Sequence, residues 1–281
     1  MKTENKALKI AFVGGGNMAS ALIAGLAGKL TAAPNIHVVD PNVDVLQKLR
    51  VQFRVDTAAT IDAAVAGCDV IVLAVKPQSM REVAAQLLPV LKEGALPLVL
   101  SIAAGIRSAD LARWLGGYGA IVRCMPNTPA LIGLGITGMV ATGGVSEPQK
   151  LAAEAIMRAV GATVWLDDEA LIDPVTAVSG SGPAYVFYFI EAMQQAAEEM
   201  GLSAQQGTQL ALATFVGAAQ LAAQSPDPVS VLRQRVTSKG GTTHAALTSM
   251  EQSGVKGKIV AAMKAAAQRG KELGEELGML D

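Results

Sequence analysis

Residues 9–20, KIAFVGGGNMAS, decide the fold of this chain. A short apolar run, residues 9–13, predicts a buried strand, and it leads directly into three glycines. Gly14, Gly16 and Ala19 fit the spacing G-x-G-x-x-A, which gives a tight turn, a close backbone approach to a pyrophosphate and close packing of the next helix. The stretch therefore predicts a dinucleotide site at the end of a first strand, although a glycine turn with a purely structural role would have the same pattern. The residues expected to hold the phosphates are Gly14, Gly16, Asn17, Met18 and Ala19.

Six more short apolar runs follow, separated by amphipathic segments. This alternation is typical of a parallel sheet covered by helices. Ser146 and Gln149 are spaced as a capping box at the start of one such helix. The sequence thus predicts a Rossmann-type, doubly wound, mostly parallel sheet. The predicted strands are residues 9–13, 36–40, 69–75, 97–103, 120–125, 136–142 and 162–166.

The strand signal ends at about Asp167, and the remaining sequence has only helical patterns. This change in pattern predicts two domains, an α/β domain over residues 1–167 and an all-helical domain over residues 168–281. The predicted helical segments are residues 173–178, 183–201, 203–224, 228–236, 242–252 and the stretch from 256 onward.

Composition excludes several classes of function. The 281 residues carry a net charge of -1, with 23 basic and 24 acidic side chains, and only 4% are aromatic. Neither a nucleic-acid surface nor an anionic membrane patch is expected from this balance. The charged start MKTENKALK is unlike a targeting segment, and the longest uncharged run, residues 124–146, contains helix breakers. We expect a cytoplasmic protein that binds neither nucleic acid nor membrane.

The cysteines and histidines are too few and too dispersed for a metal centre. Cys68 and Cys124 lie in apolar segments, which favours reduced core residues over a disulfide. His37 and His244 are the only histidines. No metal site is therefore expected.

Asp40 ends the second predicted strand, 21 residues after Ala19. An acid at this position hydrogen-bonds the adenosine ribose and disfavours a 2'-phosphate, which favours NAD. Asn42 and Arg50 could instead assist a 2'-phosphate, so the choice between NAD and NADP stays open. A local role for Asp40, as a cap or turn residue before the next helix, is the alternative.

A pair of glycines, Gly240 and Gly241, interrupts a helix-forming region at residues 228–251, PVSVLRQRVTSKGGTTHAALTSME. Glycines inside a helix cost about 1 kcal/mol each, so the break needs a reason. The N–H groups of a helix that starts here favour an anion, and the neighbouring hydroxyls of Ser238, Thr242 and Thr243 add donors. The segment could therefore hold a small carboxylate, or it could be a capped turn between two helices.

The order of residue types in this block resembles the C-terminal signature of the pyrroline-5-carboxylate reductase family. One departure is Lys239, where many members of the family have proline. Three further blocks match the family in order along the chain: AVKP at 74–77, RCMPNTP at 123–129 and VSGSGPAY at 178–185. The resemblance thus covers most of the chain.

The resemblance implies a reaction, a cofactor and a set of site residues. NADH or NADPH would donate a hydride to the C=N bond of 1-pyrroline-5-carboxylate, giving L-proline. Ser238 and Thr243 would be catalytic, with Thr243 placed to touch the ring nitrogen. The implied substrate-binding residues are Asn127, Ser238, Gly240, Gly241, Thr242 and Thr243. The implied cofactor-binding residues, beyond the glycine loop, are Asp40, Asn42, Ala74, Val75, Lys76, Pro77, Ala103 and Asn127.

The resemblance also implies that the helical domain binds substrate and forms a dimer, with five dimers in some assemblies. The proton donor stays open, since solvent could protonate the imine before binding; Tyr185 and Lys76 are the candidates in the chain. Two other functions stay open as well. One is a related imine reductase or 3-hydroxyacid dehydrogenase, which would need a catalytic lysine in the helical domain; Lys239 is the only lysine between Lys150 and Lys256. The other is a non-catalytic NAD(P)-binding sensor.

Overall fold

The computed structural model describes residues 7–93 and 96–279. Their contacts form two compact units. The first contains the described residues up to Ser181 together with those from Ala266 onward, and the second is Gly182–Ala265. The chain therefore leaves the first unit once and returns to it within its last helix.

The first unit is built on one eight-stranded sheet with the order β3-β2-β1-β4-β5-β6-β7-β8. Every neighbouring pair is parallel except β6 and β7. The predicted Rossmann-type, mostly parallel sheet is confirmed, and all seven predicted strands are present. The strands are β1 (Ile10–Val13), β2 (Ile36–Val39), β3 (Asp56–Ala58), β4 (Val70–Leu73), β5 (Leu98–Ser101), β6 (Ile121–Met125), β7 (Gly135–Ala141) and β8 (Gly161–Trp165).

The sequence analysis missed β3. This strand has three residues at the edge of the sheet, and its Asp56 is exposed. It is held in the sheet by parallel pairing with β2, in which Val38 lies opposite Thr57. A strand this short and polar has no hydrophobic alternation, so its own sequence does not predict it.

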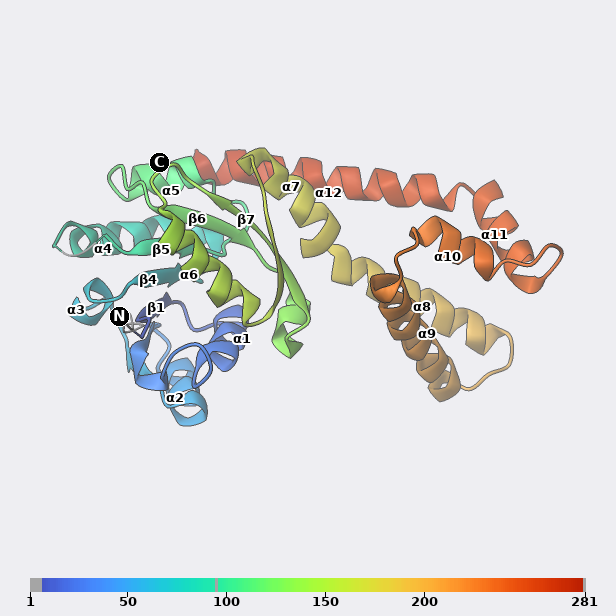
Figure 1. Ribbon diagram of the computed structural model, residues 1–281, viewed down its shortest axis with the longest axis horizontal. Helices are drawn as coiled ribbons and strands as arrows, with labels where there is room; N and C mark the ends of the chain where they lie inside the picture. Colours follow the sequence, from blue (N-terminus) through green and yellow to red (C-terminus); the bar gives the residue numbers. More distant parts are fainter. Residues whose placement is uncertain (1–6, 94–95, 280–281) are drawn as a thin grey trace. The chain divides into compact units, whose positions relative to one another are not determined.

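Helices cover both faces of the sheet (Figure 1). Buried side chains of α1, α2 and α6 pack on one face, and those of α3, α4 and α5 pack on the other. The helices of this unit are α1 (Asn17–Leu26), α2 (Val43–Phe53), α3 (Ala63–Ala66), α4 (Met80–Glu93), α5 (Ser108–Trp114), α6 (Glu147–Arg158) and α7 (Ile172–Val175). The short helical turns are η1 (Ala33–Asn35), η2 (Pro77–Ser79), η3 (Thr128–Ile132), η4 (Glu169–Leu171) and the π-helical η5 (Thr176–Gly180).

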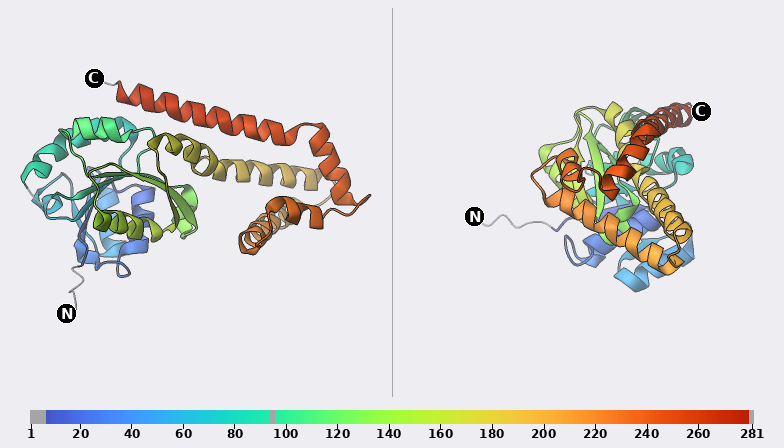
Figure 2. Two further views of the ribbon diagram at one scale, coloured as in Figure 1. Left: turned by 45° about the horizontal axis from the view of Figure 1, so that its top comes forward. Right: turned by 90° about the vertical axis from the view of Figure 1, so that its right-hand side faces the viewer.

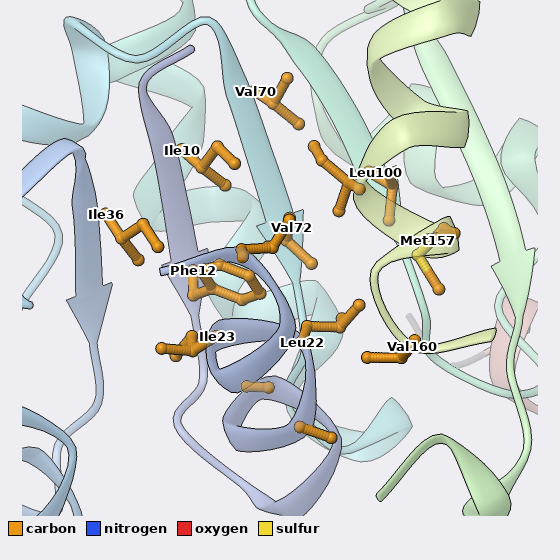
Figure 3. Close-up of a cluster of buried hydrophobic side chains, with 14 of the residues drawn as sticks. Ile10, Phe12, Leu22, Ile23, Ile36, Val70, Val72, Leu100, Met157 and Val160 are labelled. Atoms are coloured by element: carbon orange, nitrogen blue, oxygen red, sulfur yellow. The ribbon is translucent and has the colours of Figure 1, made fainter. Parts of the chain in front are cut away.

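The larger of the two cores lies under α1 and α6 (Figure 3). Phe12 of β1 is fully buried there, between Leu22 and Ile23 of α1 and Val72 of β4. Apolar strands that are buried on both faces read as continuous hydrophobic runs, which is why the sequence identified them. The core fixes the glycine loop, because that loop joins β1 to α1.

Two local predictions in this unit are confirmed. The Ser146 N–H donates to Gln149 Oε1 over 3.0 Å, as in a capping box. Cys68 and Cys124 are free, buried thiols. Burial raises the pKa of Cys68 to about 11 and raises that of Cys124 further, so both are protonated thiols at neutral pH.

The end of the last helix, α12 (Val255–Gly278), packs beside α5 (Figure 2). Arg107 Nη2 donates to the carbonyl of Lys271 over 3.2 Å, and Arg113 Nη2 donates to the carbonyl of Gly278 over 2.9 Å. Leu277 joins the apolar cluster under α5. The last helical turns are therefore part of the first unit.

The second unit is made of helices alone. It contains α8 (Gly182–Glu199), α9 (Ala204–Gln224), α10 (Val229–Arg235), α11 (Thr242–Gln252) and the first half of α12. Helices α8 and α9 form an antiparallel hairpin. Gln194 Nε2 donates to Thr208 Oγ1 over 3.0 Å, and the ring centroids of Phe189 and Phe215 lie 6.4 Å apart. The predicted helical C-terminal region is confirmed. The boundary at residues 167/168, placed where the strand signal ends, stays a prediction for the functional domains.

Candidate functional site

The glycine loop after β1 has the geometry of a phosphate cradle. Gly14 is buried with a φ of +99°, and a Cβ there would lie 2.7 Å from the carbonyl oxygen of Ala74. Gly16 is exposed, and a Cβ on it would meet no atom within 4 Å. Thus Gly14 is a glycine because the fold allows nothing else, whereas Gly16 leaves open space in front of the loop.

Helix α1 begins at this open space. Gly16 is its N-cap and offers no side chain to the first N–H groups of the ten-residue helix. Such N–H groups, with the helix dipole behind them, attract a phosphate. Asn17 is exposed, Met18 is half-buried, and Ala19 is buried against the core at 1% exposure. The loop therefore has the open, uncapped helix start that a pyrophosphate would need, and its contact with a cofactor stays a prediction.

Asp40 lies beside the glycine loop and is bound to it. Its Oδ2 accepts the N–H of Gly15 over 2.8 Å, and its Oδ1 accepts the N–H of Asn42 over 2.8 Å. Asn42 in turn caps α2 through its side chain, which accepts from Asp44 and Val45. The local role considered for Asp40 is therefore seen. Each carboxylate oxygen retains a lone pair, and the contact with a ribose stays a prediction.

Arg50, the candidate for a 2'-phosphate, is directed to β3. Its Nε donates to Thr57 Oγ1 over 3.1 Å, and its Nη2 makes a shorter bond to the same hydroxyl. The guanidinium therefore links the edge strand β3 to the end of α2 by hydrogen bonds. A role in cofactor choice would require it to give up this contact.

The residues after β4 form the opposite wall of the glycine loop. The Ala74 N–H donates to the carbonyl of Val13 over 2.8 Å, and its own carbonyl is the group nearest to Gly14. Val75 and Pro77 are half-buried and Lys76 is exposed. The short turn η2 begins at Pro77. This segment meets the loop through its backbone, with the Lys76 side chain at the surface.

The segment after β5 reaches the same edge of the sheet. Ser101 and Ala103 are buried, and the Ala103 N–H lies 3.5 Å from Ser101 Oγ. Gly105 has a φ of +76°, and a Cβ there would lie 2.9 Å from Leu277 of α12. The carboxyl ends of neighbouring strands are where open α/β sheets bind ligands, and Ala103 lies at such an end, so its contact with the cofactor stays a prediction.

Asn127 uses both ends of its amide inside the protein. Its Oδ1 accepts the N–H of Ile136 over 2.9 Å, and its Nδ2 donates to the carbonyl of Ser179 over 3.2 Å. The residue therefore ties the loop after β6 to the π-helical turn η5. One N–H and one lone pair are left for a ligand, so the predicted ligand contact of Asn127 is limited to those.

The predicted carboxylate site lies in the second unit. Gly240 has a φ of +75°, and the Gly241 N–H donates to the carbonyl of Ser238 over 3.0 Å. A Cβ on Gly241 would lie 2.6 Å from Ser238 Oγ. Both glycines are thus required by the turn, and Ser238 lies against the start of α11.

Gly241 is the N-cap of the eleven-residue α11 and has no side chain to cap it. No capping side chain therefore competes for the first-turn N–H groups, which would be available to a small anion. Thr242 is exposed and Thr243 is half-buried in that first turn. The structure thus gathers Ser238, Gly240, Gly241, Thr242 and Thr243 at one helix start, as the sequence predicted.

The Tyr185 hydroxyl, one of two proton-donor candidates, is buried without a hydrogen-bond partner in the described chain. It lines an apolar groove of the second unit, about 460 Å³ in volume, with Tyr188, Phe189 and Ile259 among its other residues. Glu169, which no sequence pattern singled out, pairs with the buried Arg123.

Among residues 7–93 and 96–279, no three His, Cys, Asp or Glu side chains are grouped as metal ligands would be. No helix in these ranges combines the length and the apolar character needed to cross a bilayer.

Comparison with known proteins identifies the two parts of the chain separately. Residues 169–273 match the family model described as pyrroline-5-carboxylate reductase dimerisation. Residues 9–105 match the model described as NADP oxidoreductase coenzyme F420-dependent. The second match covers the glycine loop, Asp40, the residues after β4 and Ala103.

Whole-chain relatives agree with the match to the dimerisation model. The chain is 47% identical to a pyrroline-5-carboxylate reductase of Pseudomonas aeruginosa, over 96% of this chain and 98% of the relative. It is 41% identical to that of Haemophilus influenzae, over 94% and 97%.

Solved structures give the same result. A pyrroline-5-carboxylate reductase from Coxiella burnetii superposes with a TM-score of 0.89 at 39% identity, covering 95% of this chain and 99% of that one. The Plasmodium falciparum pyrroline carboxylate reductase with NADP bound has a TM-score of 0.83 at 31% identity, covering 95% and 98%. This chain therefore belongs to the pyrroline-5-carboxylate reductase family.

Proposed function

We propose that this chain transfers a hydride from NADH or NADPH to the C=N bond of 1-pyrroline-5-carboxylate and so makes L-proline. The predicted family, the fold and the class of NAD(P)-dependent oxidoreductase are confirmed by the relatives. The observation that carries the proposal is the start of α11, where two glycines and three hydroxyl side chains surround uncapped N–H groups. Such a site suits a small carboxylate.

The cofactor fits the loop that the structure builds. Gly16 leaves open the space in front of α1, and any larger residue would place a Cβ in it. We assign the pyrophosphate to the N–H groups at Gly16, Asn17 and Met18. The rest of the proposed cofactor set comprises Gly14, Ala19, Asp40, Asn42, Ala74, Val75, Lys76, Pro77, Ala103 and Asn127.

The chain's own residues bind and orient the substrate. The reduced nicotinamide, when bound, supplies the hydride. The N–H groups of α11, with Gly240 and Ser238, would hold the carboxylate, and Thr242 would add a hydroxyl at its rim. Thr243 Oγ1 would accept a hydrogen bond from the ring nitrogen, which favours the protonated iminium over the neutral imine. Because an iminium accepts hydride readily, protonation by solvent suffices and no buried acid is needed.

The same unit is proposed as the self-association surface. Its exposed apolar side chains include Phe187, Tyr188, Leu210 and Leu221, each between 56% and 72% exposed. A second copy that covers them would form the dimer for which the family model is named, and five such dimers are the proposed larger assembly. The proposed location of the protein is the cytoplasm.

The test is the oxidation of NADH and, separately, of NADPH by purified protein with 1-pyrroline-5-carboxylate. We expect turnover with at least one cofactor. Thr243→Ala should lower kcat/KM by about tenfold to a thousandfold, and Thr243→Ser should recover most of the loss, because a hydroxyl is restored. Cofactor binding without turnover would contradict the proposed reaction and favour a related imine or a sensor role.

A further inference from the structure

Arg123 and Glu169 form a charged pair inside the first unit that the proposed reaction does not use. Arg123 lies in β6, in register with Ser101 of β5, and its side chain is 6% exposed. Its Nη1 donates to Glu169 Oε1 over 2.8 Å. A guanidinium this deeply buried requires an anionic partner, and Glu169 provides it.

The same oxygen of Glu169 has a second donor. It accepts the N–H of Ser108 over 2.7 Å, and Ser108 is the first residue of α5. The N-cap of α5, Arg107, provides no side-chain cap of its own. Glu169 therefore caps α5 from 61 residues away and joins it to β6 and η4 through one carboxylate oxygen.

This junction holds one end of the loop that leaves β5, residues 102–107. At its other end, the Ile102 N–H donates to the carbonyl of Leu73 over 3.1 Å. Between the two ends, Leu277 of α12 packs against Gly105. The loop contains Ala103, which lies at the carboxyl end of β5, where open sheets bind ligands. Its path is thus set by three contacts, and Glu169 supplies the charged one.

We propose that Glu169 is a positioning residue for cofactor binding. It does not touch the cofactor; with Arg123 it holds the N-terminus of α5 and thereby the loop at Ala103 that forms a wall of the cofactor site. The proposal rests on the proposed function, since it places the cofactor at this edge of the sheet. It also makes the first residue of the matched dimerisation region, residues 169–273, a determinant of the cofactor site.

The test compares Glu169→Gln and Glu169→Ala with the matched variant Glu154→Gln. Glu154 accepts comparable bonds from Arg158 and Trp165, but it faces the edge strand β8, four strands away from β4 in the sheet. The readouts are the dissociation constants of NADH and NADPH, measured by the fluorescence of the cofactor, and the melting temperature. We expect Glu169→Gln to raise the cofactor dissociation constant by about threefold to tenfold and Glu169→Ala by more, and Glu154→Gln to change it less than about twofold.

A double variant separates positioning from stability. Arg123→Met with Glu169→Met replaces the ion pair by apolar side chains of similar length, which commonly restores stability. The Ser108 N–H still loses its acceptor, so we expect the melting temperature to recover while the cofactor dissociation constant stays raised. The KM for 1-pyrroline-5-carboxylate at saturating cofactor should stay near that of the unaltered chain.

Two results would overturn the proposal: cofactor affinity unchanged in both Glu169 variants, or affinity that recovers together with stability in the double variant. A failure of the proposed function would look different. In that case the unaltered chain would bind neither cofactor, or Gly16→Ala would leave binding unchanged.

Discussion

Gly14 and Gly16 stand two residues apart in one motif, yet the structure predicts opposite consequences for replacing them with alanine. At Gly14, the φ of +99° is strained for any L residue, and the new Cβ would lie 2.7 Å from the carbonyl oxygen of Ala74. Cβ contacts shorter than 3.0 Å are essentially never found in proteins, so β1 and β4 would have to separate. They are held together there by the bond from the Ala74 N–H to Val13.

The magnitudes follow from those two observations. The backbone strain costs about 1–3 kcal/mol, and overpacking against a fixed backbone adds about 1–3 kcal/mol. We therefore expect Gly14→Ala to lose about 3–5 kcal/mol of the free energy of unfolding, which lowers the melting temperature by about 10 °C. At Gly16, the φ of -66° is ordinary and the space is empty, but alanine is a poorer N-cap than glycine, so Gly16→Ala should change the free energy of unfolding by no more than about 1 kcal/mol.

Gly16→Ala should instead weaken cofactor binding while it leaves stability nearly unchanged. Its new methyl group would occupy the space through which a pyrophosphate approaches α1, so the dissociation constant of NADPH should rise about tenfold or more. Thermal unfolding followed by circular dichroism and titration of cofactor fluorescence measure the two effects on the same samples. A Gly14→Ala protein that melts like the unaltered chain, or a Gly16→Ala protein that keeps its cofactor affinity, would refute this account of the loop.

Three further substitutions test single side chains. Asp40→Asn should shift the ratio of kcat/KM toward NADPH by about tenfold, since it removes about 1–2 kcal/mol of repulsion between a carboxylate and a 2'-phosphate; an unchanged ratio would remove Asp40 from the ribose site. Hydrogen bonds from Trp165 and Arg158 lower the pKa of Glu154, so its stabilising effect is complete above the unfolded pKa and is lost as the pH falls through the folded one. Glu154→Gln should therefore flatten the fall in melting temperature below about pH 4.5, and an unchanged acid limb would contradict this. Tyr185→Phe should keep both the pH–rate profile and the melting temperature, because the buried hydroxyl has no partner in the described chain; a lost limb of the profile would restore Tyr185 as the proton donor.

The motifs predicted local geometry well, because that geometry depends on a few adjacent residues. Gly14 and Gly241 were expected from spacing alone, and each is required by one close contact within its own turn or with the neighbouring strand. Strands β1, β4 and β5 were found because all of their residues are buried, and β8 was found from its apolar composition although Ala162 and Val164 are exposed. In contrast, β3 depends on its pairing with β2, and its own composition is polar.

Contacts between distant segments were beyond the reach of the sequence. Asn127 was expected to face a ligand, and the structure adds that its amide is already bound to Ile136 and Ser179. Glu169 is an ordinary surface-type residue in the sequence, and only the fold brings it to Arg123 and Ser108. A motif shows which residue types occur together along the chain, whereas a residue that positions others is recognised by what it contacts.

In the helical unit, the sequence predicts where the helices lie but not which of their residues are buried. In α9, leucines 210, 212 and 221 are all exposed, although they do not lie on one face of a helix, and the buried residues of this helix are Gly207 and Ala211. A helix that is apolar on more than one face must bury the second face against another surface. Within the described residues of Gly182–Ala265, that surface is missing, because the hairpin of α8 and α9 covers one side of each helix. The apolar pattern of this region therefore fits self-association, and it predicts helices correctly while overstating what a single chain can bury.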